Sequence, residues 1–408
     1  MDSDMIVLER LPGQARSLRI AFVTETYPPE INGVSLSVAR FIEGLRRRNH
    51  DIQLIRPRQT RADRAGEGME EVLMRGLPIP RYPGLKMGLP AKRALTEMWS
   101  VARPDLVHIV TEGPLGWSAL QAALKMKLPV TSDFRTNFHA YSGHYGVGWL
   151  KKPIASYLRK FHNRTLMTMV PTEHQRRELA RLGFRELQVV ARGVDTRLFN
   201  PERRSQKLRE SWGAGPDGLV ALYVGRLAPE KNLALVGAAF EALSRARPEA
   251  KLVLVGDGPG RGALERRFPQ AVFAGLRRGE ELATHYASGD VFLFPSMTET
   301  FGNVTLEAMA SGLAVLAYDY AAAAEHIRHG ENGYTAEFGD AQAFTRLAAE
   351  RCVDHAALRA LGAAARATAE RLDWDVVVRR LEALFLSVAD GGRLAVDDGR
   401  AMPLPRVG

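Results

Sequence analysis

The sequence predicts an α/β protein made of two consecutive doubly wound domains, and three observations carry this prediction. The chain has 408 residues, which is more than one ordinary hydrophobic core accommodates. Short apolar runs alternate with segments of helical spacing, a pattern typical of βαβ units that build a parallel sheet. A charged and then Gly/Pro-rich stretch at residues 203–218 interrupts the alternation, which restarts after it. We interpret that stretch as the linker region between the domains.

The first half contains six apolar runs that we interpret as buried strands. They cover residues 18–24, 51–55, 105–110, 128–132, 166–172 and 187–193. The segment after the first run has apolar residues at helical spacing, namely Val34, Val38, Phe41, Ile42 and Leu45. We expect residues 17–202 to form an N-terminal domain.

The second half repeats this rhythm with five further strand candidates, each followed by a helical stretch. They cover residues 219–225, 251–256, 271–275, 290–296 and 313–319. We expect residues 203–374 to form a second domain. The sequence that follows is amphipathic, with Val377, Leu381, Leu384 and Phe385 along one side, and it predicts a last helix at 375–390. Residues 391–408 predict a disordered tail.

Bulk composition narrows the class of protein without choosing a function. The formal net charge of +10 and the pI of about 9.8 suit contact with nucleic acid, an anionic membrane or a phosphorylated substrate. No apolar run reaches about 18 residues, so no membrane-spanning helix is predicted. The single cysteine, Cys352, excludes an internal disulfide, and the first 17 residues lack the features of a secretory signal. We therefore expect a cytoplasmic protein.

Ligands of parallel α/β sheets bind beyond the carboxyl ends of the strands, so the loops that follow the strands hold the candidate site residues. Gly33 lies in the first of these loops and opens a helix. A glycine there lets the backbone approach a ligand, and the helix N-terminus offers N–H groups to an anion. The alternative is a turn that needs a positive φ.

Two cations, Arg226 and Lys231, follow the strand candidate at 219–225. A guanidinium and an ammonium beside a helix N-terminus suit a diphosphate, whereas the alternative is a solvated basic loop. The next loop contains Gly256, Gly258 and Gly260, which make a tight strand-to-helix turn. That turn either borders a nucleotide or only redirects the chain.

The string "ETFGNVTLE" places one acid, Glu299, in a loop and a second, Glu307, in the first turns of the helix that follows. Asn303 is the expected N-cap of this helix, and the amides of residues 301–303 can face the same volume as Glu299. Two acceptor-only carboxylates around free N–H donors suit a polyhydroxylated ligand, with one binding sugar hydroxyls and the other a ribose diol. The alternative is a helix with favourable acids near its N-terminus.

The loop after the strand candidate at 128–132 gathers Arg135, His139 and several aromatic rings, and such a cluster favours a functional role. Two D-x-D strings, at residues 2–4 and 373–375, do not follow strands that lead to a cleft. We therefore predict no metal at either one, and we expect Asp373 to cap the last helix.

Residues 150–164 form an amphipathic segment with a strongly basic side. Its apolar side carries Ile154, Tyr157, Leu158 and Phe161. Such a segment suits peripheral contact with an anionic leaflet, and the alternative is a helix of the domain with a solvated basic face.

Taken together, several strings resemble the retaining glycosyltransferases of family 4, which have the GT-B fold. "GRLAPEKN", "GDGP" and "ETFGNVTLE" resemble the donor-binding half, and "FVTETYPPEINGVS", "VHIVTEGPLG" and "RGVDTRLFNP" resemble the acceptor half. The resemblance is closest to the branch that contains GDP-mannose-dependent α-mannosyltransferases and sulfoquinovosyl-type lipid glycosyltransferases. It implies two Rossmann-like domains that face a central cleft, with the last helix crossing back onto the N-terminal domain.

The resemblance also implies roles for the matched residues. Arg226 and Lys231 would hold the donor diphosphate, and the loop of Gly33 would approach it. Glu299 would bind the transferred sugar and Glu307 the ribose hydroxyls. The amides that would assist Glu299 belong to Phe301, Gly302 and Asn303.

One departure from the branch concerns the residue beside the reacting sugar. The branch usually has a string such as Tyr-His-Thr-Asn-Phe where this chain has "FRTNFHAY", so Arg135 stands at the usual histidine position and His139 lies four residues later. His139 can both donate and accept a proton, whereas Arg135 would stabilise the charge of the diphosphate. Both stay candidates, and we name His139 first.

The function implied is a hexosyltransferase that acts with retention and needs no cofactor and no metal. It would move a hexose, with mannose as the first choice, from GDP-mannose or a UDP-sugar to a glycolipid, lipid-linked or polysaccharide acceptor. Expected partners are these substrates and an anionic membrane surface at the inner face of the cell membrane, without nucleic acid. Two alternatives stay open: a nucleotide-sugar epimerase of the same fold, and a non-catalytic basic protein that binds a membrane or nucleic acid.

Overall fold

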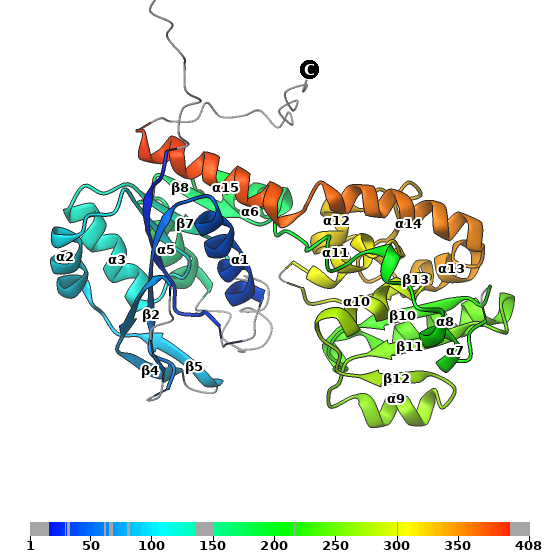
Figure 1. Ribbon diagram of the computed structural model, residues 1–408. Coiled ribbons are helices and arrows are strands. Elements are labelled where there is room, and N and C mark those ends of the chain that lie inside the picture. Colours follow the sequence, from blue (N-terminus) through cyan, green and yellow to red (C-terminus); the bar gives the residue numbers. More distant parts are fainter. Residues whose placement is uncertain are drawn as a thin grey trace, which may run out of the picture.

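The computed structural model describes residues 16–391 apart from residues 29, 31–32, 61–62, 65–67, 80–81, 136–150, 216 and 300. Within these residues the chain forms two α/β halves side by side, each built around its own parallel sheet (Figure 1). The site candidate His139 lies outside the described residues, and so does the predicted tail at 391–408 apart from its first residue.

The first sheet has seven described strands in the spatial order β3-β2-β1-β6-β7-β8-β9, and every neighbouring pair is parallel. The strands are β1 (Arg19–Val23), β2 (Asp51–Pro57), β3 (Glu70–Met74), β6 (Leu106–Ile109), β7 (Val130–Asp133), β8 (Met167–Val170) and β9 (Leu187–Val189). A separate antiparallel hairpin joins β4 (Gly76–Ile79) to β5 (Tyr82–Gly88). The helices of this half are α1 (Gly33–Arg47), α2 (Lys92–Val101), α3 (Pro114–Lys125), α5 (Lys151–His162) and α6 (Glu173–Arg181).

The strands β1, β6 and β8 near the middle of this sheet are buried along most of their length, which is typical of a parallel sheet with helices on both faces. Side chains of a strand point alternately to opposite faces. In β1, Ile20 and Phe22 accordingly join a core with α1, whereas Ala21 and Val23 join a second core with α2 and α3.

The second sheet has six described strands in the order β12-β11-β10-β13-β14-β15, again all parallel. The strands are β10 (Val220–Val224), β11 (Lys251–Val255), β12 (Val272–Gly275), β13 (Val291–Phe294), β14 (Ala314–Tyr318) and β15 (Tyr334–Ala336). The helices of this half are η2 (Pro201–Arg203), α7 (Gln206–Ser211), η3 (Pro229–Lys231), α8 (Leu233–Ala246), α9 (Arg261–Arg267), α10 (Gly279–Ala287), α11 (Asn303–Ala310), α12 (Ala321–His326), α13 (Ala341–Arg351) and α14 (His355–Glu370). The chain continues into α15 (Trp374–Ala389), which packs on the first half.

Each of the eleven apolar runs contains a strand, so the predicted fold class of two doubly wound α/β units is confirmed. The interpretation of residues 203–218 as a linker is wrong. This stretch contains α7, which packs on the second half through Arg209, whose buried guanidinium donates to Ser288 O at 2.8 Å and to Asp290 Oδ2 at 3.0 Å. Its charged composition reflects an exposed helix with one arginine turned inward.

The chain passes between the halves twice, and the two crossings lie side by side. Val194 on the first crossing donates its N–H to Leu372 O on the second at 2.9 Å, and Val194 also forms a β-bridge with Asp373. The guanidinium of Arg366 then donates to Thr196 O at 3.0 Å and to Phe199 O at 2.8 Å. The first crossing therefore precedes the stretch that we interpreted as the linker.

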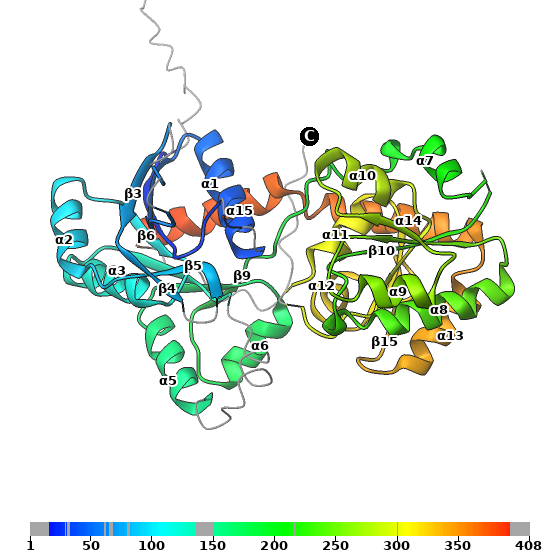
Figure 2. The same cartoon turned by 90° about the horizontal axis from the view of Figure 1, so that it is seen from below.

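The last helix, α15, starts at the second crossing and lies along the first half (Figure 1, red; Figure 2). The prediction that Asp373 caps this helix is confirmed, because its carboxylate accepts the N–H of Asp375 at 2.9 Å. Val378 packs where a side chain at Gly44 of α1 would lie, and the ring of Phe385 is 6.0 Å from that of Phe22. The proposed domain bounds of 17–202, 203–374 and 375–390 stay predictions.

The amphipathic segment predicted at 150–164 contains the helix α5 of the first half, and most of its apolar side packs against that half. Leu158 is 5% exposed and Phe161 is fully buried, because both pack in the cores of this half. Arg159, Lys160 and Arg164 are exposed, and so is Tyr157 at 39%, so the surface open to solvent is basic with one aromatic ring. Within the described ranges, no helix has the length and apolar character needed to cross a membrane.

Candidate active site

The strongest polar contact between predicted site residues joins Lys231 to Glu299. Because β10 and β13 are neighbours in the sheet, the loop that ends in η3 lies beside the loop that follows β13. Lys231 Nζ lies 2.5 Å from Glu299 Oε1, and the hydroxyl of Ser296 donates to the same oxygen at 2.6 Å. The lysine and glutamate side chains are 18% and 16% exposed, so the ion pair is partly shielded from water.

Gly302 rather than Asn303 occupies the cap position of α11, which corrects the sequence prediction. Gly302 has φ 89° and ψ 59°, and Asn303 is the first helical residue and makes no side-chain cap bond. The left-handed conformation favours glycine because it has no Cβ. Phe301 before it is fully buried, and the edge of its ring faces the imidazole of His326 at 6.0 Å. The turn thus anchors the segment that carries the predicted amide donors.

Glu307 lies in the second turn of α11 and accepts a hydrogen bond from the hydroxyl of Tyr286 at 2.9 Å. Burial raises the pKa of Glu307 to about 7, although the Tyr286 hydrogen bond acts in the opposite direction. Burial and the Glu307 charge together raise the pKa of Tyr286 well above its usual value. The side chain of Glu307 can therefore hold or release a proton near neutral pH.

Arg226 lies exposed at the end of β10, and the hydroxyl of Tyr223 donates to its carbonyl at 3.1 Å. The glycines of the neighbouring loop make close backbone contacts, which are expected of a tight turn that redirects the chain. A Cβ at Gly256 would lie 2.0 Å from Gly225 O, and one at Gly258 would lie 2.5 Å from Leu227 O. These glycines hold the loops after β10 and β11 against each other.

Gly33 is the first residue of α1, and a Cβ at this position would lie 2.8 Å from Arg192 Nη1. Arg192 was given no role from the sequence, yet it links several predicted residues. It is 4% exposed, its guanidinium lies 5.6 Å from the centre of the Phe301 ring, and its Nη1 lies 3.5 Å from Asn303 Oδ1. Arg192 thus reaches from the first half to the sugar-binding loop predicted in the second.

Arg135 follows β7 and donates from Nε to Asp133 Oδ2 at 2.7 Å. His108 Nε2 lies 3.6 Å from the same oxygen. Burial alone would raise the pKa of Asp133, but the charges of Arg135 and His108 outweigh burial and lower the pKa to about 2. Asp133 is therefore a permanent anion that fixes Arg135 at the strand end. Since His139 lies outside the described residues, the choice between Arg135 and His139 stays a prediction.

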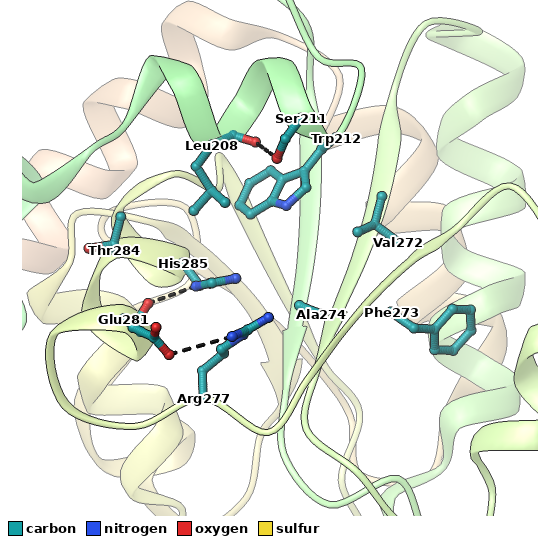
Figure 3. Close-up of a pocket in the computed structure, with 10 residues that line it drawn as sticks. All are labelled: Leu208, Ser211, Trp212, Val272, Phe273, Ala274, Arg277, Glu281, Thr284 and His285. Atoms are coloured by element: carbon teal, nitrogen blue, oxygen red, sulfur yellow. Dashed lines mark hydrogen bonds and ion pairs between the residues drawn. The ribbon is translucent and has the colours of Figure 1, made fainter.

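A cavity of about 530 Å³ lies in the second half between α7, β12 and α10 (Figure 3). Its walls include the rings of Trp212 and His285, whose centres are 5.6 Å apart, and Arg277, whose Nη1 lies 3.5 Å from Glu281 Oε2. None of the predicted site residues lines it. In the described part of the chain, no group of three or more His, Cys, Asp and Glu side chains is placed to hold a metal ion.

Comparison with known proteins places the chain in a family. Residues 31–198 match the family described as Glycosyltransferase Family 4, and residues 218–352 match Glycosyl transferases group 1. Over 374 residues the chain is 34% identical to a GDP-mannose-dependent alpha-mannosyltransferase of Mycolicibacterium smegmatis, and the match covers 89% of this chain and 96% of that protein. The chain belongs to glycosyltransferase family 4. It is accordingly a hexosyltransferase.

This family 4 glycosyltransferase is also 30% identical over 373 residues to the sulfoquinovosyl transferase SQD2 of Arabidopsis thaliana, which covers 89% of this chain and 72% of that protein. Among solved structures, a sucrose-phosphate synthase of Thermosynechococcus elongatus superposes with a TM-score of 0.72 at 18% identity, over 92% of this chain and 100% of that one. The structure of HepE of Anabaena in complex with UDP superposes with a TM-score of 0.72 at 19% identity, over 91% of this chain and 100% of that one. These likenesses support the GT-B fold predicted from the sequence.

Proposed function

We propose that this glycosyltransferase transfers mannose from GDP-mannose, with retention at the anomeric carbon, to a glycolipid, lipid-linked or polysaccharide acceptor. The observation that carries the proposal is the contact between Lys231 and Glu299 where β10 and β13 end. An ammonium for the diphosphate and a carboxylate for the sugar hydroxyls then occupy one place in the donor half. The choice of GDP-mannose is supported by the name of the mycobacterial relative.

In the proposed reaction, the bond between the anomeric carbon and the diphosphate oxygen breaks while the acceptor hydroxyl oxygen bonds to the same face of that carbon. The acceptor proton passes to the departing phosphate oxygen, so no protein nucleophile takes part. Lys231 and Arg226 stabilise the negative charge that develops on the diphosphate. Lys231 is paired with Glu299 before the donor arrives, so donor binding exchanges this ion pair for separate contacts to phosphate and sugar.

The remaining contacts of the donor are assigned by the same proposal. Glu307 binds the ribose hydroxyls, and the amides of the segment that begins at Phe301 assist Glu299. His139 or Arg135 lies beside the reacting sugar. We propose that side-chain cations neutralise the diphosphate and that transfer needs no metal, so a chelator should leave the rate unchanged.

We propose that the acceptor is bound by the first half and that the enzyme meets the inner face of the cell membrane through charge. The exposed cations of α5 support this, since Leu158 and Phe161 on the apolar side of the helix are buried. Each lysine or arginine near an anionic surface contributes about 1 kcal/mol to attraction.

The proposal is tested by donor binding and product analysis. A thermal-shift screen of GDP- and UDP-sugars should show the largest stabilisation with GDP-mannose, because ligand binding stabilises the folded state by mass action. Purified enzyme with this donor and a lipid or polysaccharide extract should form an α-mannoside, with the anomeric configuration read by NMR. An isomerised donor would identify an epimerase instead, and no product with any donor would support a non-catalytic protein.

Two substitutions connect this activity to the site. Lys231→Ala and Glu299→Ala should each remove most of the transfer while the fold is retained. Glu97→Ala is the matched control, because Glu97 forms an exposed ion pair with Arg93 far from the strand ends. Normal turnover in either site variant would contradict the proposed roles.

A further inference from the structure

Two buried guanidinium groups of the first half, those of Arg135 and Arg192, lie close enough for the charge of Arg135 to lower the pKa of Arg192. Arg135 is 9% exposed and Arg192 is 4% exposed. Nε of Arg135 donates to Asp133, but Nη1 of Arg135 and Nε of Arg192 have no hydrogen-bond partner among the described residues. Buried polar groups are nearly always paired, so the unpaired nitrogen on each arginine is available to donate to a bound ligand.

The carboxylates near Arg192 are already engaged by other cations. Asp133 is held by Arg135 and His108, and Glu299 is held by Lys231. The other contacts of Arg192 are the ring of Phe301 and the neutral amide oxygen of Asn303 at 3.5 Å, which is a long hydrogen bond. Burial and the charge of Arg135 lower the pKa of Arg192 to about 9. Asp133 and Glu299 favour the charged form of Arg192 but do not offset burial and Arg135, and a charge that is only partly compensated is costly in a buried position.

The position of Arg192 relates this charge to the proposed donor site. Arg192 touches one side of the segment that runs from Phe301 to Asn303. Glu299 contacts the same segment, because its Cγ lies 3.6 Å from the place of a Cβ at Gly302. On the first half, the missing side chain of Gly33 leaves the room in which Nη1 of Arg192 lies. An anion bound here would contact both halves beside the transferred sugar.

We propose that Arg192, together with Arg135, forms an anion subsite that binds phosphate oxygens of the donor diphosphate and stabilises the charge that develops there. The inference rests on the proposed function and extends it, because it assigns part of the leaving-group contact to the acceptor half. A planar guanidinium fork matches the oxygens of phosphate. Nucleoside diphosphate then neutralises the repulsion between the two arginines.

The test compares binding of GDP and of guanosine to the wild type, Arg192→Gln, Arg192→Lys and Arg197→Gln by isothermal titration calorimetry. Arg197 is the matched control, because it lies on the same crossing and its side chain is 87% exposed. Arg192→Gln should weaken GDP binding about tenfold or more and leave guanosine binding unchanged. Arg192→Lys should recover part of the GDP affinity, and Arg197→Gln should bind as the wild type does.

A thermal melt without ligand separates this role from a structural one. Arg192→Gln should melt at the wild-type temperature or above it, since it removes a buried charge. A lower melting temperature with unchanged GDP affinity would overturn the proposal, and so would an equal loss of GDP and guanosine. If Arg192→Gln left the GDP affinity unchanged but raised the KM for the acceptor, the proposal would be wrong, and Arg192 would instead bind an anionic group of the acceptor. A wild type that binds neither GDP nor UDP would instead contradict the proposed function itself.

Discussion

Replacing Glu307 by glutamine should stabilise the ligand-free enzyme at pH 8. Burial raises the pKa of Glu307 from its usual 4.5 to about 7, so between these values the folded state binds more protons than the unfolded state. Stability contributed at low pH is therefore lost as the pH rises through this window. Glutamine keeps an oxygen that accepts the hydrogen bond from Tyr286 but cannot ionise, so the variant escapes this loss.

The magnitude follows from the size of the pKa change. A difference between 4.5 and about 7 corresponds to about 3 kcal/mol at about 1.4 kcal/mol per pH unit. The glutamate keeps some exposure to solvent, so this value is an upper limit. At about 2–4 °C per kcal/mol for a domain of this size, the melting temperature should rise by several degrees.

The assay is urea or thermal unfolding of wild type and Glu307→Gln at intervals from pH 5 to pH 8. The difference in the free energy of unfolding should be smallest at pH 5, at about a quarter of its final value, and should reach its plateau above pH 7. Glu25, whose pKa burial also raises to about 7, contributes equally to both proteins and cancels in the difference. Parallel pH profiles, or a variant less stable than wild type at pH 8, would refute the reasoning.

Three further outcomes follow from the fold. Gly302→Ala should lower the free energy of unfolding by about 1–2 kcal/mol, because the φ of 89° at this position is unfavourable for residues with a Cβ. In the same urea titration the control Gly262→Ala, at a helical position of α9, should be neutral or stabilising. Asp373→Ala should lower the free energy of unfolding by about 1 kcal/mol through loss of the α15 cap, and an unchanged denaturation midpoint would contradict this. Reversing the charge of Arg159 and Lys160 should reduce co-sedimentation with anionic vesicles, and equal binding of the wild type to neutral vesicles would end the membrane proposal.

The sequence was sufficient for the central strands because strands buried on both faces are unbroken apolar runs. The strands that it missed lie at edges or are short. β3 begins with two glutamates and its side chains are partly exposed, and β15 has three residues. The hairpin of β4 and β5 contains glycine and proline, which obscure the alternation expected of strands.

The sequence predicted which loops carry the site residues, but it did not predict which side chains contact one another. The rule that ligands bind at strand ends selected Lys231 and Glu299, but only the order of the strands places their loops together. Arg192 was missed although it opens the string "RGVDTRLFNP", because that string indicated only a family resemblance and gave the arginine no contact. The cap of α11 was assigned to Asn303 from residue preference, whereas the backbone conformation at Gly302 decided it.

The paired crossings restrict how the two halves can move. A single covalent connection would let one half rotate about its own axis. Two crossings held together by hydrogen bonds from Val194 and Arg366 act instead as a hinge with a fixed axis. Opening and shutting is then permitted and twisting is resisted. Under the proposed function, we expect this restriction to present the acceptor to the donor sugar in one orientation, and a mixture of product linkages would contradict that expectation.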